Sequence, residues 1–380
     1  MRILFVAMPD SVHTARWIKQ VCGLGWDIHL FPATVGPLHP SLPPEVRAHQ
    51  APGNNFKLVR AVRKAGNLFL PGVQPARLCR LIGELKPDIV HSMEIQHGAY
   101  LTLEAKKRLG REFPDWIVSS WGSDIYHFGK FPEHAPRIRE TLASCDYYHC
   151  DCARDAELVR RHGFKGKILP VIPSYGGFDV AQARRLRSPL PPSRRRGIML
   201  KGYQGWAGRA LVGLDALERC VDLLAGYELC VYVSDIAAQA RAFASKTGVK
   251  VTVIPRGTVP DDEMLRLHGN ARVSIGLSIS DGLPASLMEA VLMGSFPLQS
   301  DTGAADEWLM HGQTCLLVPP EDTGAVAAAL RRALSDDALV DNAARANIAM
   351  MEERFSADKI TSMTRDLYAS VLSLRRIGRQ

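Results

Sequence analysis

The sequence of 380 residues contains no apolar run of the roughly 18 residues that a membrane-spanning helix needs. It also has no compositional bias. Hydrophobic residues make up 46% of the chain and charged residues 23%, which are ordinary values for a globular protein and exclude a disordered or fibrous one. At about 100–200 residues per domain, this length predicts two or three domains, each with its own core.

The chain also lacks a C-x-x-C pair among its eight cysteines. Most of these cysteines stand between apolar residues, so we interpret them as reduced thiols of the core. The pattern nearest to a metal cluster is His149-Cys150-Asp151-Cys152, with no second cluster nearby. We interpret it as the buried end of a strand and expect no metal site there.

Positive charge is concentrated in the first half of the chain. Residues 1–190 contain 26 Lys and Arg against 17 Asp and Glu, whereas residues 191–380 contain 21 against 22. A basic face of this kind suits nucleic acid, an anionic membrane or a phosphorylated acceptor. The N-terminal MRILFVAMPD has one basic residue and no small-residue cleavage site, so it reads as a first strand rather than a signal peptide. We therefore expect a cytoplasmic protein.

Strand and helix patterns alternate along most of the sequence, which predicts βαβ units and parallel sheets. The segment 183–197 interrupts the alternation with three prolines and six arginines, and we expect it to be a linker. The expected organisation is an α/β fold of two Rossmann-like doubly wound domains that face a central cleft. The domains are expected over residues 1–182 and 198–357. A C-terminal helix over 358–380 is expected to pack back toward the first domain. The expected strands are 2–8, 26–33, 89–93, 116–122, 143–152, 198–202, 228–234, 250–257, 272–280 and 295–300. The expected helices include 13–25, 210–224, 237–248, 261–271 and 286–294.

The densest group of polar residues follows the strand predicted over 272–280. Asp281 comes at the end of that strand, and Glu289 lies in the first turn of the next predicted helix, so both can face the edge of the sheet where α/β proteins bind ligands. The backbone N–H groups of Leu287 and Met288 would attract a diphosphate there. Ser286 and Glu289 also form an S-x-x-E capping box, and helix capping alone could explain both residues.

The segment SISDGLPASLMEAVLMGSFPLQSDTGAADEWLMHGQTCLLVPPED resembles the donor-site signature of the retaining GT-B glycosyltransferases of family 4. RGTVPDDEM upstream, the opening RILFVAMPDSVHTARWIKQ, the PDIVHS strand and VIPSYGGFD also resemble this family, so the similarity covers nearly the whole chain. The resemblance implies a hexosyltransferase that uses a nucleotide-sugar donor.

The resemblance also implies roles for residues of the second domain. Glu289 would bind the ribose hydroxyls of the donor, and Asp281, where the family usually has Glu, would face the transferred sugar. Arg256-Gly257-Thr258 would contact the base through its backbone. Backbone donors to the sugar and phosphate would come from the stretch that includes Gly282, Leu283, Pro284, Ser286, Leu287 and Met288.

The family usually has an Arg and a Lys after the first strand of this domain, where they neutralise the leaving diphosphate. Lys201 and Arg209 are the candidates here, although their spacing is unusual, and they could also be ordinary solvated side chains. The chain has no Asp-x-Asp motif, which argues against a metal-dependent GT-A enzyme. We therefore expect no cofactor and no metal.

In the first domain the family often places a His-Gly turn near the reaction centre, whereas this chain has Trp121-Gly122-Ser123-Asp124. Trp121 could stack on a sugar, and Asp124 could replace the missing polar group or simply cap a helix. Four histidines are candidates for acceptor binding, although an isolated histidine is often structural: His13, His91, His97 and His127.

The expected reaction is transfer of a hexose from UDP or GDP to a hydroxyl of a saccharide or lipid-linked acceptor. The basic stretches 56–70 and 104–112 could bind the inner face of an anionic membrane, which would make this a peripheral membrane protein. Alternatively, they could be solvated helix faces. We expect no nucleic-acid partner. Two alternatives remain: a nucleotide-sugar epimerase of the same architecture, and a non-catalytic nucleotide-sugar-binding subunit.

Overall fold

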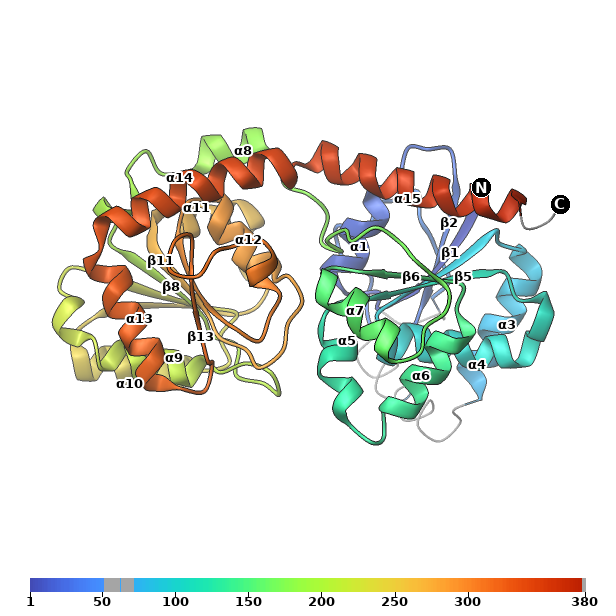
Figure 1. Ribbon diagram of the computed structural model, residues 1–380, viewed down its shortest axis with the longest axis horizontal. Helices are drawn as coiled ribbons and strands as arrows, with labels where there is room; N and C mark the ends of the chain where they lie inside the picture. The colour runs from blue at the N-terminus through green and yellow to red at the C-terminus, as the bar shows by residue number, and fades with distance from the viewer. Residues whose placement is uncertain (51–61, 63–71, 378–380) are drawn as a thin grey trace. The chain divides into compact units, whose positions relative to one another are not determined.

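The computed structural model describes residues 1–50, 62 and 72–377, and within this part of the chain it divides into two compact units (Figure 1). Unit 1 consists of Met1–Gly177 and the C-terminal segment that starts at Ile360. Unit 2 consists of Phe178–Lys359. Each unit is an α/β fold around one parallel sheet, which confirms the expectation of two Rossmann-like domains.

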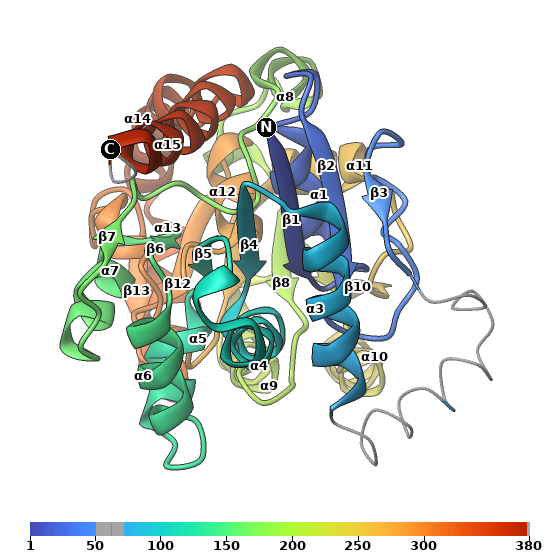
Figure 2. The ribbon, with the colours of Figure 1, turned by 90° about the vertical axis from the view of Figure 1, so that its right-hand side faces the viewer.

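The sheet of unit 1 has seven strands in the order β3-β2-β1-β4-β5-β6-β7 (Figure 2). Its strands are β1 (Arg2–Ala7), β2 (Asp27–Pro32), β3 (Arg47–Ala48), β4 (Ile89–Met93), β5 (Asp115–Ser120), β6 (Tyr147–Cys150) and β7 (Lys167–Ile168). The helices are α1 (Val12–Lys19), α3 (Val73–Leu85), α4 (Tyr100–Leu109), α5 (Ser123–Tyr126), α6 (Ala135–Ser144), α7 (Ala153–Arg161) and α15 (Ala357–Ile377), with a π-helical turn at Ile95–Ala99 and 3₁₀ turns at Gly110–Glu112 and Phe128–Lys130.

Both faces of this sheet are buried, because its side chains alternate between two layers of helices. Leu4 and Val6 of β1 join one apolar core, together with side chains of α3, α4 and α6. Phe5 points the other way, toward His91 of β4, and that face is covered by α1 and α15 (Figures 1 and 2). The strands therefore read as nearly continuous apolar runs in the sequence.

The sheet of unit 2 has six strands in the order β10-β9-β8-β11-β12-β13. Its strands are β8 (Gly197–Lys201), β9 (Glu228–Tyr232), β10 (Lys250–Ile254), β11 (Ala271–Gly276), β12 (Phe296–Ser300) and β13 (Leu316–Val318). The helices are α8 (Val180–Leu186), α9 (Ala210–Glu218), α10 (Ala237–Thr247), α11 (Asp261–Asn270), α12 (Ala285–Leu292), α13 (Thr323–Ser335) and α14 (Asp337–Arg354), with 3₁₀ turns at Pro192–Arg194, Val221–Leu223 and Ala305–Glu307. The helix expected over 210–224 ends at Glu218 and continues only as a 3₁₀ turn.

Residues 183–197, which we expected to form a linker, lie inside unit 2 and are packed there. They include the second half of α8, a 3₁₀ turn and the start of β8. Arg195 is only 4% exposed, and its guanidinium donates to the carbonyls of Leu190, Ala271 and Met293. Basic residues here therefore bind carbonyl oxygens, which the Pro- and Arg-rich composition did not indicate.

The C-terminal helix α15 contributes side chains to unit 1. The Trp17 indole donates to the hydroxyl of Tyr368 at 2.9 Å, and Thr364 donates to the side chain of Gln20 at 2.8 Å. Tyr368 and Thr364 are fully buried. Helix α15 is thus an integral part of the unit 1 core, although it is separated from α1 by more than 300 residues.

Each sheet has one point at which the strand order reverses. In unit 1 this point lies between β1 and β4, and in unit 2 between β8 and β11. The loops at the carboxyl ends of such a strand pair diverge to opposite faces, which leaves a crevice where open α/β sheets bind ligands. These two positions are therefore where functional side chains are expected in each unit.

Candidate active site

Lys201 and Asp281 face each other at the reversal point of unit 2. Lys201 is the last residue of β8, and Asp281 lies in the loop that follows the neighbouring strand β11. The Lys201 Nζ atom is 3.7 Å from Asp281 Oδ2, and both side chains are about one quarter exposed. A cation and a carboxylate are thus held together at the carboxyl edge of the sheet, where a ligand can reach both.

The loop between β8 and α9 is fixed onto the loop after β11. Ile279 N–H donates to the carbonyl of Ala207 at 2.8 Å, and Arg209 N–H donates to that of Leu277 at 3.0 Å. A Cβ atom on Gly208 would lie 2.0 Å from the Tyr203 carbonyl oxygen, so only glycine fits there. These contacts hold the two loops together at the edge of the sheet.

Arg209 lies at the start of α9, in this same loop. Its Nε donates to Glu321 Oε1 at 2.8 Å, and its Nη1 donates to the carbonyl of Gly208 at 2.8 Å. The Arg209 side chain is 22% exposed, whereas that of Glu321 is 67% exposed. An anionic ligand could therefore replace the exposed Glu321 carboxylate without removing Arg209 from its position.

Helix α12 begins differently from the sequence prediction. Its N-cap is Pro284 rather than Ser286, so the S-x-x-E capping box does not form, and Glu289 lies in the second turn instead of the first. The N–H groups of Leu287 and Met288, which we expected to be free, donate to the Pro284 carbonyl at 3.1 and 3.2 Å. The N–H groups of Ala285 and Ser286 come before Leu287 and Met288 in the helix. The backbone amides that could bind an anion are therefore expected at these first two residues of α12.

Ser286 instead connects α12 to strand β9, which β8 separates from β11 in the sheet. Its side chain shares a hydrogen bond with the hydroxyl of Tyr232, the last residue of β9. Burial raises the pKa of Tyr232, and the nearby charge of Glu289 raises it further. Tyr232 therefore keeps its proton, and Glu289 lies close to this hydroxyl on the half-buried face of α12.

Residues 282–284, between Asp281 and α12, are buried, as is the inner face of the first turns of α12. Leu283 and Leu287 are 3% and 4% exposed, and Met288 is fully buried. Gly282 accepts a hydrogen bond from Ala304 N–H at 3.0 Å, and its own N–H donates to Asp281 Oδ1 at 3.0 Å. Apolar packing therefore fixes the position of this backbone.

The turn at Arg256 and Gly257 follows β10, two strands away from β8 in the sheet. Gly257 has a φ of +69°, which an L-residue rarely adopts. The Arg256 guanidinium lies 5.9 Å from the Tyr203 ring centroid. Burial raises the pKa of Tyr203, as do the Asp235 and Asp281 charges, while Arg256 opposes this shift. Tyr203 thus lies within electrostatic reach of both Arg256 and Asp281.

In unit 1, His13 and Trp121 are in ring contact. His13 is in the first turn of α1, after β1, and Trp121 follows β5. Their ring centroids are 5.3 Å apart at an angle of 52°. Because β4 lies between β1 and β5 in the sheet, this contact crosses the end of β4, at the reversal point of unit 1.

Asp124 fixes two of the loops at this point. Its Oδ1 accepts from Ile95 N–H at 2.7 Å, and its Oδ2 accepts from Trp121 N–H at 2.6 Å. Asp124 is only 3% exposed, and burial, with the charge of Glu94, raises its pKa to about 7. Both oxygens hold backbone groups, so Asp124 positions Trp121, and the N-cap of α5 is Gly122.

Glu94 is a residue of this region that sequence reasoning missed. It is 5% exposed, has a φ of +64°, and its Oε1 accepts from the N–H groups of His97 and Gly98 at 2.7 Å each. The same oxygen lies 3.2 Å from His97 Nδ1, and this contact raises the pKa of His97. Glu94 therefore positions His97 and favours its protonated form, and the His97 side chain is 53% exposed.

The remaining two histidines have different surroundings. His91 is fully buried, with Nδ1 2.6 Å from the Tyr368 hydroxyl and Nε2 2.6 Å from Ser119 Oγ. Its ring offers no surface to an acceptor, which argues against the binding role we expected. His127 is half-buried, with its ring 4.9 Å from that of Phe131.

Two family models match the chain. "Glycosyl transferase 4-like" matches residues 2–151, and "Glycosyl transferases group 1" matches residues 226–350. Together they cover about seven tenths of the sequence, and each falls on one unit. The chain belongs to the group 1 glycosyltransferases.

Solved structures share the fold of this chain. This glycosyltransferase is similar to sucrose-phosphate synthase from Thermosynechococcus elongatus, with 16% identity, a TM-score of 0.72, and coverage of 98% of this chain and 100% of that one. It is also similar to HepE from Anabaena in complex with UDP-glucose, with 14% identity, a TM-score of 0.67 and coverage of 97% and 100%. The trehalose 6-phosphate synthase of Burkholderia multivorans has 13% identity, a TM-score of 0.72 and coverage of 100% and 98%. No curated protein matches the chain in sequence.

Among the residues that the structure describes, no three His, Cys, Asp or Glu side chains are arranged to hold a metal ion. Cys150 donates to the Cys152 carbonyl at 3.2 Å, and the eight cysteines are free thiols, six of them buried. Across residues 1–50 and 72–377, no helix is long and apolar enough to cross a membrane.

Proposed function

We propose that this glycosyltransferase is a retaining enzyme that moves a hexose from a UDP-sugar to a hydroxyl of a saccharide or lipid-linked acceptor. The observation that carries the proposal is the pairing of Lys201 with Asp281 at the reversal point of unit 2. A cation beside a carboxylate suits a donor whose phosphate is negative and whose sugar is rich in hydroxyls, because each group can then bind its own part of the ligand.

In this proposal the diphosphate lies against Lys201, Arg209 and the first amides of α12. Two cations and a helix N-terminus favour the negative charge that develops as the diphosphate leaves. Glu289 would accept hydrogen bonds from the two ribose hydroxyls, and Asp281 one from the transferred sugar. The Arg256–Gly257 turn would contact the base. These cations could neutralise the leaving group without a divalent metal.

UDP is proposed as the nucleotide because HepE, a structure of the same fold, was obtained with UDP and with UDP-glucose. GDP differs in having a larger base, so the residues around Arg256 and Tyr203 would decide between the two.

The proposed reaction breaks the bond between the anomeric carbon and the diphosphate oxygen. The acceptor oxygen forms its bond to the same face of that carbon, and its proton passes to the departing diphosphate oxygen. No protein nucleophile is needed, so the residues of the site bind and stabilise charge. Unit 1 would bind the acceptor through His13, His97 and Trp121, with Asp124 positioning Trp121.

A peripheral membrane location stays part of the proposal. Residues 56–70, the first of the two basic stretches, lie outside the described residues, with the single exception of Val62. The second, residues 104–112, lies on α4 and the turn after it, where Lys107 is 2.8 Å from Glu140 and Lys106 is 3.6 Å from Asp146. These lysines already have acidic neighbours, so binding of anionic vesicles would have to be measured directly.

The test is a transfer assay with the full chain. Release of UDP from UDP-glucose and UDP-galactose is measured with and without a panel of saccharide acceptors, with and without EDTA, and the product is examined by NMR. The proposal expects acceptor-dependent release that EDTA does not change, and an α-linked product from an α-linked donor. A β-linked product would exclude retention, and conversion of the donor sugar without an acceptor would favour the epimerase.

A further inference from the structure

A pocket of about 430 Å³ lies in unit 1 beside the residues proposed to receive the acceptor. It is bordered by the π-helical turn after β4, the start of α4, the 3₁₀ turn after α5 and the start of α6. Helices α4 and α6 lie next to each other in this unit (Figure 2). A pocket of this size falls within the range that binds small ligands.

Three rings form much of its wall. The Tyr100 and His134 rings are nearly parallel, with centroids 6.1 Å apart at 18°, and Phe128 meets His134 at 5.0 Å and 66°. Tyr100 is buried, with its hydroxyl 3.2 Å from His134 Nδ1, so its ring is held in place. Fixed aromatic faces favour a flat ligand that has C–H groups on its broad side, as a pyranose ring does.

The polar groups of the pocket are varied and nearly balanced in charge. Gln96, His97, Glu133 and Arg137 also line it. The guanidinium of Arg137 lies 4.2 Å above the Tyr100 ring, and its Nη2 is 3.7 Å from Glu104 Oε1. His97 is likewise paired with a carboxylate. Mixed donors and acceptors of this kind suit hydroxyl groups better than a phosphate or a carboxylate.

Hydrogen bonds link the wall of the pocket to the candidate acceptor region. Gln96 Nε2 donates to the Asp124 carbonyl at 3.0 Å, and Asp124 holds Trp121. His97 lines the pocket and is positioned by Glu94 at the end of β4. A ligand whose reacting end lies near Trp121 could therefore place its next ring in this pocket, against Phe128 and His134.

We propose that this pocket binds one neutral pyranose ring of a saccharide acceptor, adjacent to the ring that receives the transferred sugar. This inference rests on the proposed function, because it takes the ligand of unit 1 to be the acceptor. It narrows the acceptor to one with at least two sugar rings.

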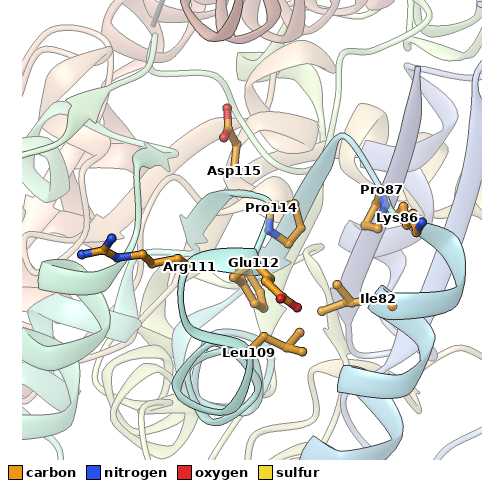
Figure 3. A pocket seen from close by; sticks show the side chains of 10 residues that line it. Ile82, Lys86, Pro87, Leu109, Arg111, Glu112, Pro114 and Asp115 are labelled. Carbon is orange, nitrogen blue, oxygen red and sulfur yellow. The ribbon is translucent and has the colours of Figure 1, made fainter. Parts of the chain in front are cut away.

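A second pocket of unit 1 offers a matched control. It has the same volume of about 430 Å³ but lies at the opposite edge of the sheet, where Pro87 precedes β4 and Pro114 precedes β5. Figure 3 shows Glu112 and Ile82 near its centre, with the Arg111 and Asp115 side chains directed away from them. Phe113 is the one aromatic residue among those that line it, so it lacks the facing rings.

The experiment is saturation-transfer difference NMR of the full chain with methyl α-glucopyranoside, methyl β-galactopyranoside, maltose and lactose. Wild type is compared with Phe128→Ala, with Arg137→Gln, and with the matched pair Glu133→Gln in the pocket and Glu112→Gln in the control pocket. Arg137, Glu133 and Glu112 are exposed, so at least three variants are expected to fold. UDP binding is measured on the same samples.

The proposal expects at least one glycoside to give a saturation signal that falls at least fivefold in Phe128→Ala and in Glu133→Gln and is unchanged in Glu112→Gln. Overturning results are the absence of a signal for every glycoside with wild type, or equal signals in all variants. UDP binding is measured separately. If wild type does not bind UDP, this result counts against the proposed donor and not against the proposed pocket.

Discussion

The Nζ atom of Lys201 lies 3.7 Å from Asp281 Oδ2, across the two strands at which the sheet of unit 2 reverses its order. Neither residue is near the other in sequence. They meet because β8 and β11 are hydrogen-bonded neighbours, with Leu200 opposite Ile275. The first strand of the unit and the fourth therefore deliver a cation and a carboxylate to one edge, and this arrangement is the basis of the proposed donor site.

Lys201→Ala should reduce sugar transfer by about 100- to 1000-fold, because one of the two cations that stabilise the leaving diphosphate is lost. Lys201→Arg should retain more activity than the alanine variant. Steady-state UDP release from UDP-glucose measures the effect. The control is Lys250→Ala at the start of β10, where the lysine side chain is 70% exposed and pairs with Glu228. Similar rates for Lys201→Ala and Lys250→Ala would show that Lys201 does not contact the diphosphate.

Gly98→Ala should destabilise the protein by about 1–3 kcal/mol, as overpacking of a filled site does. A Cβ atom on Gly98 would lie 2.6 Å from the Val6 carbonyl oxygen and 2.8 Å from that of Met93. Gly83, in the last turn of α3, has no atom outside its own helix within 4 Å of its added Cβ, so Gly83→Ala should instead stabilise by about 0.5–1 kcal/mol. Thermal denaturation of the two variants provides the measurement, and equal shifts in Tm would refute the close approach of the π-helical turn to β1.

Asp151→Asn should change how stability depends on pH. Asp151 is buried, accepts from the N–H and hydroxyl groups of Ser174, and burial raises its pKa to about 8. The unfolded chain loses this proton near pH 4, so between pH 4 and 8 the folded state binds more protons than the unfolded state. The Asp151 contribution therefore makes the wild-type free energy of unfolding fall as pH rises through this window.

The asparagine variant has no such proton to retain. Its free energy of unfolding, relative to wild type, should rise by up to about 1.4 kcal/mol per pH unit between pH 5 and 8. Urea denaturation at four pH values measures this difference. Asp366→Asn on α15, which removes an exposed carboxylate, should keep the wild-type dependence. A pH profile for Asp151→Asn that parallels wild type would mean that Asp151 is ionised in the folded protein.

The order of the elements was largely predictable, because buried parallel strands give continuous apolar runs and their helices give amphipathic ones. The backbone conformation in the loops at the ends of the strands was not predictable. Ser286 and Glu289 have the spacing of a capping box, yet the chain enters α12 through Pro284, whose φ of −64° and ψ of 128° place the helix start two residues earlier. A pattern of residue types does not fix where the backbone turns.

His91 shows a second limit. Both faces of β4 are buried, so the sequence does not reveal which neighbours a side chain on this strand meets. Its partner Tyr368 comes from α15, 277 residues further on in the sequence. The Tyr368 hydroxyl is hydrogen-bonded to both His91 and Trp17, and no local sequence pattern indicates this network. Glu94 was missed for a related reason, since its positive φ depends on the packing of the turn that follows β4.

The central claim, that unit 2 binds a nucleoside diphosphate at the Lys201–Asp281 edge, is tested most directly by the thermal shift that UDP causes in wild type and in Glu289→Ala. The account predicts that UDP raises the Tm of wild type and of a control, Glu228→Ala, whose carboxylate lies at the opposite end of the sheet. It predicts no such rise in Glu289→Ala. Equal stabilisation of wild type and Glu289→Ala, or no stabilisation of wild type by UDP, would contradict it.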